Sequence, residues 1–163
     1  MPIVESKIEI GRSPSDVFQL AQDYDLRLEW DPFLRDMKFL NGASRAEVGV
    51  EVWVKAKNGF EMTVEYISLV EPHTVSMKML RGPFFFKHFA GTWKFRELST
   101  ERTEVVFRYN FETRPGIIRP VLSPIIRRVF NRDIRLRLQG LKTSAEETNI
   151  LERLYAKGGK IHC

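Results

Sequence analysis

Alternation of apolar and polar residues over the first two thirds of the chain predicts a series of β-strands. Residues 2–10 place Val4, Ile8 and Ile10 on one face. The same alternation recurs in six later segments, 36–40, 48–56, 60–66, 75–79, 84–95 and 105–112. A period of two is typical of strands that bury one face. We therefore expect about seven strands that share one apolar face.

Turn signals between these segments indicate antiparallel pairing. Asn58-Gly59 is a hairpin dipeptide, for which we expect a type I′ turn with positive φ at both residues. The later strands are not separated by a helical segment long enough to make a parallel crossover. Consecutive strands should therefore form a meander, and a meander of this width twists and curls.

Helical patterns flank the strands. Ser13-Pro14-Ser15-Asp16 is typical of a helix start, with Ser13 as the cap and Pro14 in the first position, and a second short helix is expected over 26–28. From about 119 to 147, apolar residues recur at spacings of three and four, and Pro120 and Pro124 suit the first turns of this helix. A helix of this length can cover the whole concave face of the sheet.

The order of these elements predicts one α+β domain of the helix-grip type over residues 1–147, followed by a C-terminal tail over 148–163 with a frayed end. The domain is expected to contain a curved antiparallel sheet, two short helices and a long C-terminal helix. Where a curled sheet wraps a single helix, the two surfaces diverge toward one end, and apolar ligand pockets arise in such places. The architecture therefore predicts an internal cavity.

Composition supports a single ligand-binding domain. The chain has 163 residues, the usual size of one domain, and its 12 phenylalanines suit a roomy interior. The only cysteine is Cys163, which excludes an intramolecular disulfide and a cysteine-based metal cluster. No segment has the run of about 20 apolar residues that spans a bilayer, and no signal peptide is evident. These features favour a cytoplasmic protein.

Candidate ligand-binding residues are those whose strand or helix position points to the predicted interior. They are Trp30, Phe33, Val54, Met62, Tyr66, Met77, Met79, Trp93, Phe95, Phe107, Tyr109, Phe130, Ile134, Arg137 and Leu141. Roughly half of the aromatic side chains should be ordinary core. A buried phenol needs a hydrogen-bond partner, so Tyr66 and Tyr109 either bond within the protein, which we favour, or serve a ligand.

Arg137 falls within the apolar stripe of the long helix, and a buried cation needs a partner. Asp133, one helical turn earlier, is the favoured partner. The alternative is that Arg137 contacts a polar group of the ligand.

The opposite face of the same helix is basic. Arg128, Arg132, Arg135 and Lys142 lie in one stripe, and the whole chain has a net charge of +5. A solvated surface is the favoured interpretation. The alternative is an anionic partner, either RNA or a ribosome, or a membrane surface.

No known catalytic or phosphate-binding motif and no metal-ligand cluster is present, so we assign no catalytic residue, cofactor or metal. Four segments, 17–23, 81–84, 91–95 and 105–112, together with the closing helix, resemble the polyketide cyclase/dehydrase and coenzyme-Q-binding family of the START-like superfamily. The resemblance covers residues 3 to about 147 and implies a START/Bet v 1-like fold.

The resemblance implies binding of a lipid, a quinone or a polycyclic ligand, as a carrier or sensor. Two other functions stay open. Ribosome-associated proteins of the RatA type are similar to this pattern, which would imply a regulator that contacts RNA. Cyclases are similar too, and would use cavity phenols and Arg137 to polarise a carbonyl group.

Overall fold

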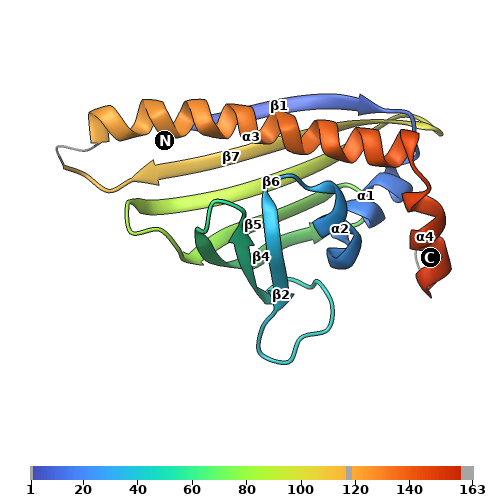
Figure 1. Ribbon diagram of the computed structural model, residues 1–163, viewed down its shortest axis with the longest axis horizontal. Helices are drawn as coiled ribbons and strands as arrows, with labels where there is room; N and C mark the ends of the chain where they lie inside the picture. Colours follow the sequence, from blue (N-terminus) through green and yellow to red (C-terminus); the bar gives the residue numbers. More distant parts are fainter. Residues whose placement is uncertain (1, 117–118, 159–163) are drawn as a thin grey trace.

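The computed structural model of the protein, which describes residues 2–116 and 119–158, contains one seven-stranded antiparallel sheet (Figure 1). The strands are β1 (Ile3–Ile10), β2 (Leu34–Phe39), β3 (Glu51–Ala56), β4 (Glu61–Val70), β5 (Thr74–Arg81), β6 (Phe86–Ser99) and β7 (Arg102–Thr113). From β2 to β7 each strand pairs with the next, and β1 pairs with β7. The predicted meander is confirmed.

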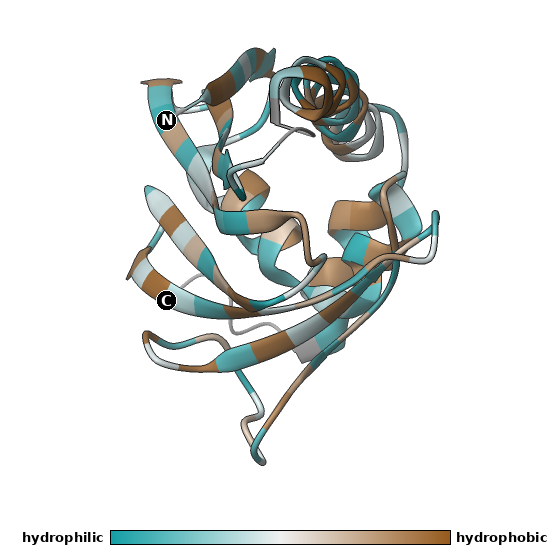
Figure 2. Cartoon of the chain, turned by 90° about the vertical axis from the view of Figure 1, so that its left-hand side faces the viewer, coloured by the Kyte–Doolittle hydropathy of each residue, from teal (hydrophilic) through white to brown (hydrophobic). Residues whose placement is uncertain are grey.

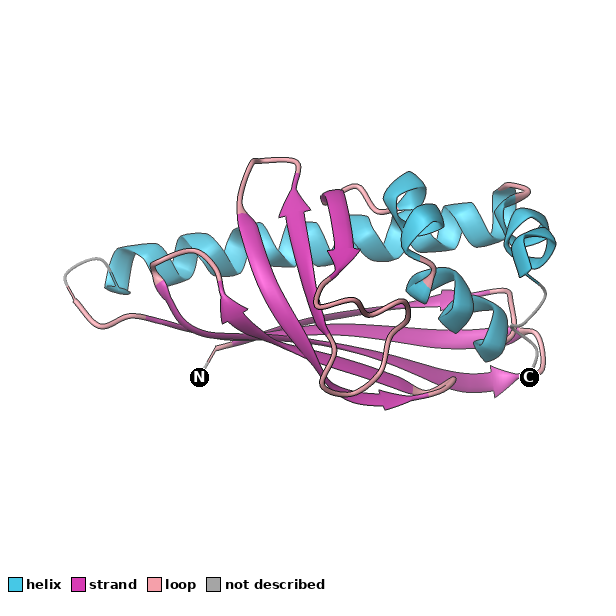
Figure 3. Ribbon diagram, turned by 90° about the horizontal axis from the view of Figure 1, so that it is seen from below, coloured by secondary structure: helices cyan, strands magenta, loops and turns pink. Residues whose placement is uncertain are grey.

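The described residues also form four helices. Two short helices, α1 (Pro14–Gln22) and α2 (Tyr24–Trp30), connect β1 to β2. The long helix α3 (Arg119–Glu147) lies across the concave face of the sheet, and α4 (Ile150–Gly158) follows it (Figure 3). Figure 2 looks along α3 and shows the sheet curling beneath it. The predicted α+β helix-grip architecture is confirmed, and Ser13 caps α1 by accepting a hydrogen bond from the Asp16 amide.

One turn and the start of one strand differ from the prediction. At Asn58-Gly59 only the glycine has positive φ, at 96°, because the Asn58 side chain instead accepts a hydrogen bond from the Phe60 amide. The type I′ prediction for this turn is therefore wrong. Positive φ at two successive residues occurs at Asn41 and Gly42, and the Ala43 amide closes that turn on the Leu40 carbonyl. β3 also begins later than predicted, at Glu51.

The helices at the C-terminal end were only partly predicted. Pro120 and Pro124 lie in the first two turns of α3, as predicted, but the end of the chain differs. Where the sequence predicted a frayed end, residues 150–158 form α4, and its Ile150 and Leu154 are buried. Cys163 lies outside the described residues.

The C-terminal half of α3 packs tightly. Ile134, Leu138, Leu141 and Ala145 are each at most 1% exposed. A Cβ atom at Gly140 would lie 2.5 Å from the Trp30 carbonyl oxygen, so the helix backbone meets α2 where there is no side chain. α1 and α2 lie at this end of the molecule (Figures 1 and 3), and Val17, Phe18 and Leu20 of α1 are at most 2% exposed.

The N-terminal half of α3 extends past α1 and α2, over the far end of the sheet (Figure 3). There Ile125 is 54% exposed and Val129 is 47% exposed, while Ile126 and Phe130 face inward. The C-terminal half of α3 therefore packs on buried side chains, whereas the N-terminal half leaves apolar side chains exposed. No described helix is long and apolar enough to cross a membrane.

Candidate functional site: a cavity beneath the long helix

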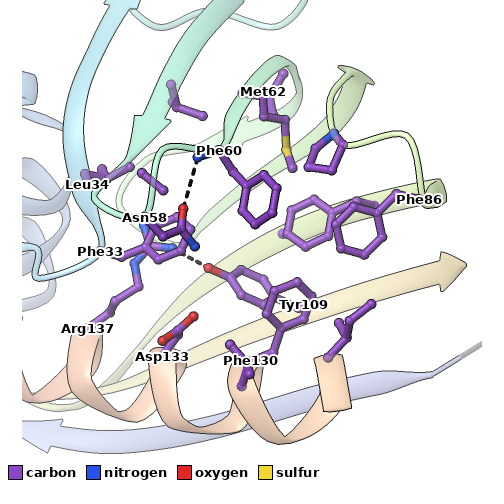
Figure 4. A pocket seen from close by; sticks show the side chains of 18 of the residues that line it. Phe33, Leu34, Asn58, Phe60, Met62, Phe86, Tyr109, Phe130, Asp133 and Arg137 are labelled. Atoms are coloured by element: carbon purple, nitrogen blue, oxygen red, sulfur yellow. Dashed lines mark hydrogen bonds between the residues drawn. The ribbon is translucent and has the colours of Figure 1, made fainter. Parts of the chain in front are cut away.

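A cavity of about 370 Å³ lies between the N-terminal half of α3 and the concave face of the sheet (Figure 4). Its volume is within the range of about 300–1,000 Å³ that is usual for ligand pockets. Side chains from α2, from β2 to β7 and from α3 form its wall. Exposed residues mark its mouth: Asn58 and Phe60 in the β3–β4 turn, Glu61 at the start of β4, and Ile125 and Val129 of α3.

Many of the residues proposed from the sequence lie in this wall. They are Phe33, Val54, Met62, Met77, Trp93, Phe107, Tyr109, Phe130 and Arg137. The others lie outside it. Trp30, Phe95, Ile134 and Leu141 are buried in the core, and Met79 is half-buried beside Gly82.

Tyr66 is a structural residue. Its hydroxyl bonds to Tyr24 and donates to the Gln22 side chain at 3.3 Å, and its ring is 1% exposed. Burial is the main cause that raises its pKa. The structure therefore has the hydrogen bonds within the protein that we favoured for Tyr66 over a bond to a ligand.

Sequence reasoning missed part of the wall. The missed aromatic residues are Phe60, Phe85, Phe86 and Phe89, and the missed residues of α3 are Leu122, Ile125, Ile126 and Val129. Phe89 has the same strand parity as Trp93, so its orientation was available in the sequence. The register shift at Phe86–His88 interrupts the alternation at the start of β6, which hides Phe86.

Aromatic rings form a continuous surface on one side of the cavity. Trp93 stacks on Phe107 with ring centroids 3.8 Å apart, and Phe107 meets Tyr109 edge-on at 4.9 Å. Phe130 of α3 then contacts both Tyr109 and Phe86. Because rings in mutual contact hold one another in place, this wall keeps its shape around the enclosed space.

The polar end of the cavity is built on Arg137. Its Nε and Nη2 donate to Oδ2 of Asp31 at 3.0 and 2.8 Å, and its Nη1 donates to the Tyr109 hydroxyl. Asp31 lies at the end of α2, 106 residues away in the chain. The predicted salt bridge with Asp133 is therefore wrong, because the nearer carboxylate is supplied by another element.

Asp31 is shared between two cations. Arg27, one turn earlier, donates from Nε to the same oxygen at 3.3 Å, and the Phe33 amide donates to Oδ1. Burial alone raises the pKa of Asp31, but Arg137 and Arg27 outweigh burial and hold this pKa below 3.8. All three charged residues are at most 6% exposed. Arg27 and Arg137 also line the cavity, so its closed end is cationic.

Tyr109 presents a hydrogen-bond donor to the cavity. Its oxygen accepts from Arg137, and among the described residues none accepts the phenolic hydrogen. Burial raises the pKa of this phenol, so the group stays protonated at neutral pH. Tyr109 therefore has a hydrogen to offer to an oxygen atom of a ligand (Figure 4).

Asp133 lies toward the mouth of the same cavity, without a hydrogen-bond partner among the described residues. Burial raises its pKa, which Arg137 partly offsets. In the described ranges no three histidine, cysteine, aspartate or glutamate side chains are grouped so as to hold a metal ion.

The basic face of α3 is divided. Arg128, Arg132 and Arg135 are exposed. Lys142, by contrast, donates to the Glu9 carbonyl and to Glu146 and thereby ties α3 to β1. Of the exposed arginines, Arg128 and Arg132 belong to the half of α3 that covers the cavity, and Arg135 lies about one turn beyond Arg132.

Residues 1–146 match the family described as "Polyketide cyclase / dehydrase and lipid transport". The chain belongs to this family. No curated protein matches the sequence.

Solved structures share the fold of this family member at low sequence identity. The protein XoxI from Bacillus cereus has a TM-score of 0.74 at 15% identity, covering 90% of this chain and 97% of that one. A START superfamily protein from Mycobacterium smegmatis has a TM-score of 0.72 at 12% identity, covering 89% and 97%. The Zhui aromatase/cyclase from Streptomyces sp. R1128 has a TM-score of 0.69 at 16% identity, covering 90% and 96%. The START-like fold predicted from the sequence is confirmed.

Proposed function

We propose that this family member binds a hydrophobic small molecule in the cavity, either a lipid, a quinone or a polycyclic, polyketide-like compound, and acts as its carrier or sensor. The observation that carries the proposal is the cavity of about 370 Å³ with its aromatic and methionine wall. An empty space of this size forfeits packing contacts that an apolar ligand restores. The lipid transport in the family description agrees with this function.

The proposed ligand has an oxygen atom at one end of an apolar body. Tyr109 and Arg137 supply hydrogen-bond donors at the closed end, whereas Met62, Met77 and Phe86 supply only apolar or weakly polar contact. A few polar groups in a mostly apolar pocket fix the orientation of a ligand. The oxygen therefore lies against Tyr109, and the apolar body extends toward the mouth.

A cavity-filling substitution tests ligand binding. Val54 lies in the wall, opposite Met62 on the neighbouring strand, so Val54→Trp places an indole ring in the cavity. The matched control is Val48→Trp, because Val48 is 63% exposed and outside the wall. The probe is N-phenyl-1-naphthylamine, a neutral dye that fluoresces in apolar surroundings. We expect saturable binding by the wild type and by Val48→Trp, and at least tenfold weaker binding by Val54→Trp.

A second, smaller substitution keeps the test valid if Val54→Trp does not fold. Met62→Phe reduces the same space by a smaller volume, and cooperative thermal unfolding checks that each variant is folded. Equal dye affinity in the wild type and in both folded cavity variants would contradict the proposal. Native mass spectrometry of the protein purified from its host should then identify a bound lipid, quinone or polyketide.

Cyclisation and dehydration of a polyketide is a second candidate function. It is favoured by one observation, the Tyr109 phenol that accepts a hydrogen bond from Arg137 and so is suited to donate to a carbonyl oxygen. A linear poly-β-ketone thioester incubated with the protein should lose one water as it cyclises, and Tyr109→Phe should slow this loss. An unchanged substrate with the wild type would exclude this second function and leave the carrier proposal standing.

We further propose that the protein works in the cytoplasm. A single cysteine fits a reducing compartment, where disulfides are rare. Fractionation of host cells with an antibody against the protein tests the location, and recovery from an extracellular or periplasmic fraction would contradict it.

A further inference from the structure

Exposed apolar side chains gather around the mouth of the cavity. Phe84, in the β5–β6 loop, is 79% exposed, and Phe60, in the β3–β4 turn, is 53% exposed. Val121, Ile125 and Val129 of α3 are 66%, 54% and 47% exposed. These five residues come from three separate elements, and we call them the rim. Large apolar side chains exposed in one area mark an interaction site more often than isolated ones do.

The α3 part of the rim is a second apolar stripe. At about 100° per residue, Val121, Ile125 and Val129 fall within an arc of roughly 80°. Ile126, Phe130 and Ile134 fall on a neighbouring arc that faces the interior. The inward stripe explains the packing of α3 on the sheet, but the rim stripe has no such role.

Aromatic contacts join the rim to the cavity. Phe84 contacts Phe85 at 5.6 Å, and Phe85 contacts both Phe60 at 5.9 Å and Phe86 at 4.7 Å. Phe86 in turn contacts Phe89 in the cavity wall. The side chain of Arg114 holds this loop by donating to the Phe84 carbonyl. An unbroken apolar surface therefore leads from the outside of the molecule into the cavity.

Positive charge borders the rim. Arg128, Arg132 and Arg135 of α3 are exposed, and none forms a salt bridge with another described residue. Two acidic residues lie at the mouth. Asp133 lies near Arg132, and Glu61 accepts a hydrogen bond from the Trp53 indole. The border therefore carries a net positive charge.

We propose that the rim docks on an anionic lipid bilayer, with the mouth of the cavity facing the acyl chains. The apolar side chains enter the boundary between headgroups and acyl chains, and the arginines contact the anionic headgroups. This is how an amphipathic helix lies in a membrane interface. Docking does not require a bound ligand, whereas exchange of ligand between membrane and cavity rests on the proposed function.

The side chains of the rim favour lipid over RNA. An RNA-binding surface combines basic residues with rings on which bases stack. Val121, Ile125 and Val129 have no ring, and RNA binding would leave them in water. A bilayer covers aliphatic and aromatic side chains alike.

Vesicle flotation with the full-length protein tests the proposal. The probes are vesicles of phosphatidylcholine alone and of phosphatidylcholine mixed with phosphatidylglycerol. We expect the wild type to float with the anionic vesicles, and Phe84→Ser and Ile125→Ser to bind about tenfold more weakly. Ile67→Ser is the matched control, because Ile67 is 45% exposed on β4 outside the rim. Equal binding of the rim variants and the control would overturn the proposal.

A charge comparison tests the headgroup contact. Arg128→Gln/Arg132→Gln should weaken flotation with anionic vesicles, and added salt should weaken wild-type flotation, since a salt concentration of 0.1 M screens exposed charges beyond about 10 Å. Arg35→Gln/Arg45→Gln removes the same charge from exposed positions outside the rim and should bind as the wild type does. Equal weakening by both pairs would contradict docking through the rim.

Two further measurements separate this proposal from the other possibilities. Membrane docking would be overturned if the protein bound a single-stranded RNA in a gel-shift assay and did not float with vesicles. It would also be overturned if the protein formed a dimer that did not float and that Ile125→Ser dissociated. Val54→Trp should float as the wild type does. If it floats and the wild type binds no dye, docking stands and the ligand proposal fails; if the wild type binds dye and does not float, only docking fails.

Discussion

The two halves of α3 cover the same sheet with opposite results. In the C-terminal half, Leu138 and Leu141 are at most 1% exposed and pack against a filled core. In the N-terminal half, Ile125 is 54% exposed, and the space beneath it is a cavity. Burial supplies most of the stability of a fold. The comparison therefore assigns stability to the C-terminal half of α3 and its core, which we call the closed half. It assigns binding to the N-terminal half and the cavity, which we call the open half.

The largest effect should come from the charge cluster between the halves. Asp31→Asn leaves the Arg27 and Arg137 guanidinium groups buried without a carboxylate, so we expect a loss of about 3–5 kcal/mol in the free energy of unfolding. Urea denaturation measures this loss. Asp36→Asn, at an exposed position on β2, should change stability little.

The same cluster predicts a pH dependence. The pKa of Asp31 is below its usual value of 3.8 in the folded protein, so its contribution to stability is present above that value. The contribution is lost as the pH falls below about 3.8 through the folded-state pKa. Urea unfolding across this range should therefore show a steeper acid loss for the wild type than for Asp31→Asn, and equal slopes would contradict this.

One pair of identical substitutions compares the halves directly. Leu141→Ala opens a void in a filled core and should cost about 2–5 kcal/mol. Leu122→Ala enlarges a cavity that already exists and should cost less than half as much. Both values come from urea denaturation. A larger loss of unfolding free energy in Leu122→Ala than in Leu141→Ala would contradict this assignment, because it would show that packing in the open half also stabilises the fold.

A smaller effect is expected where α3 touches α2. Gly140→Ala places a methyl group 2.5 Å from the Trp30 carbonyl oxygen, and relieving that overlap should cost about 1–3 kcal/mol, although alanine favours helix by about 1 kcal/mol. Gln139→Ala, exposed on the same helix, should be neutral or slightly stabilising. Thermal unfolding of both variants measures the two effects and shows how tightly α3 packs against α2 in the closed half.

The smallest effect is expected at the rim. Ile125→Ser should alter the free energy of unfolding by no more than about 0.5 kcal/mol, because its side chain is already largely in water. The same urea titration measures it. A loss above 1 kcal/mol would show that the open half also carries stability.

Local patterns made most of the fold predictable. Alternation along β7 places Val105, Phe107, Tyr109 and Phe111 on the concave face, and all four are buried. The helical period also predicted that Arg137 is buried. Its partner was not predictable, because Asp31 is brought close only by the packing of α2 on α3.

The cavity was predictable in kind and less so in extent. Strand parity found Trp93, Phe107 and Tyr109, since neighbouring strands share one concave face. Parity does not say where along the sheet the filled core ends. Phe95 and Phe107 have equivalent patterns, yet only Phe107 lines the cavity, because α1 places Phe18 against Phe95.

Gly140 gives the long helix a fixed point. The contact with Trp30 holds the backbone of α3 at one place along its length, and Leu122 lies about 27 Å away along the helix axis at about 1.5 Å per residue. A difference of about 5° in the tilt of α3 at Gly140 would place Leu122 about 2 Å away from its position here. The width of the opening therefore depends on the angle at which α3 crosses α2 at Gly140.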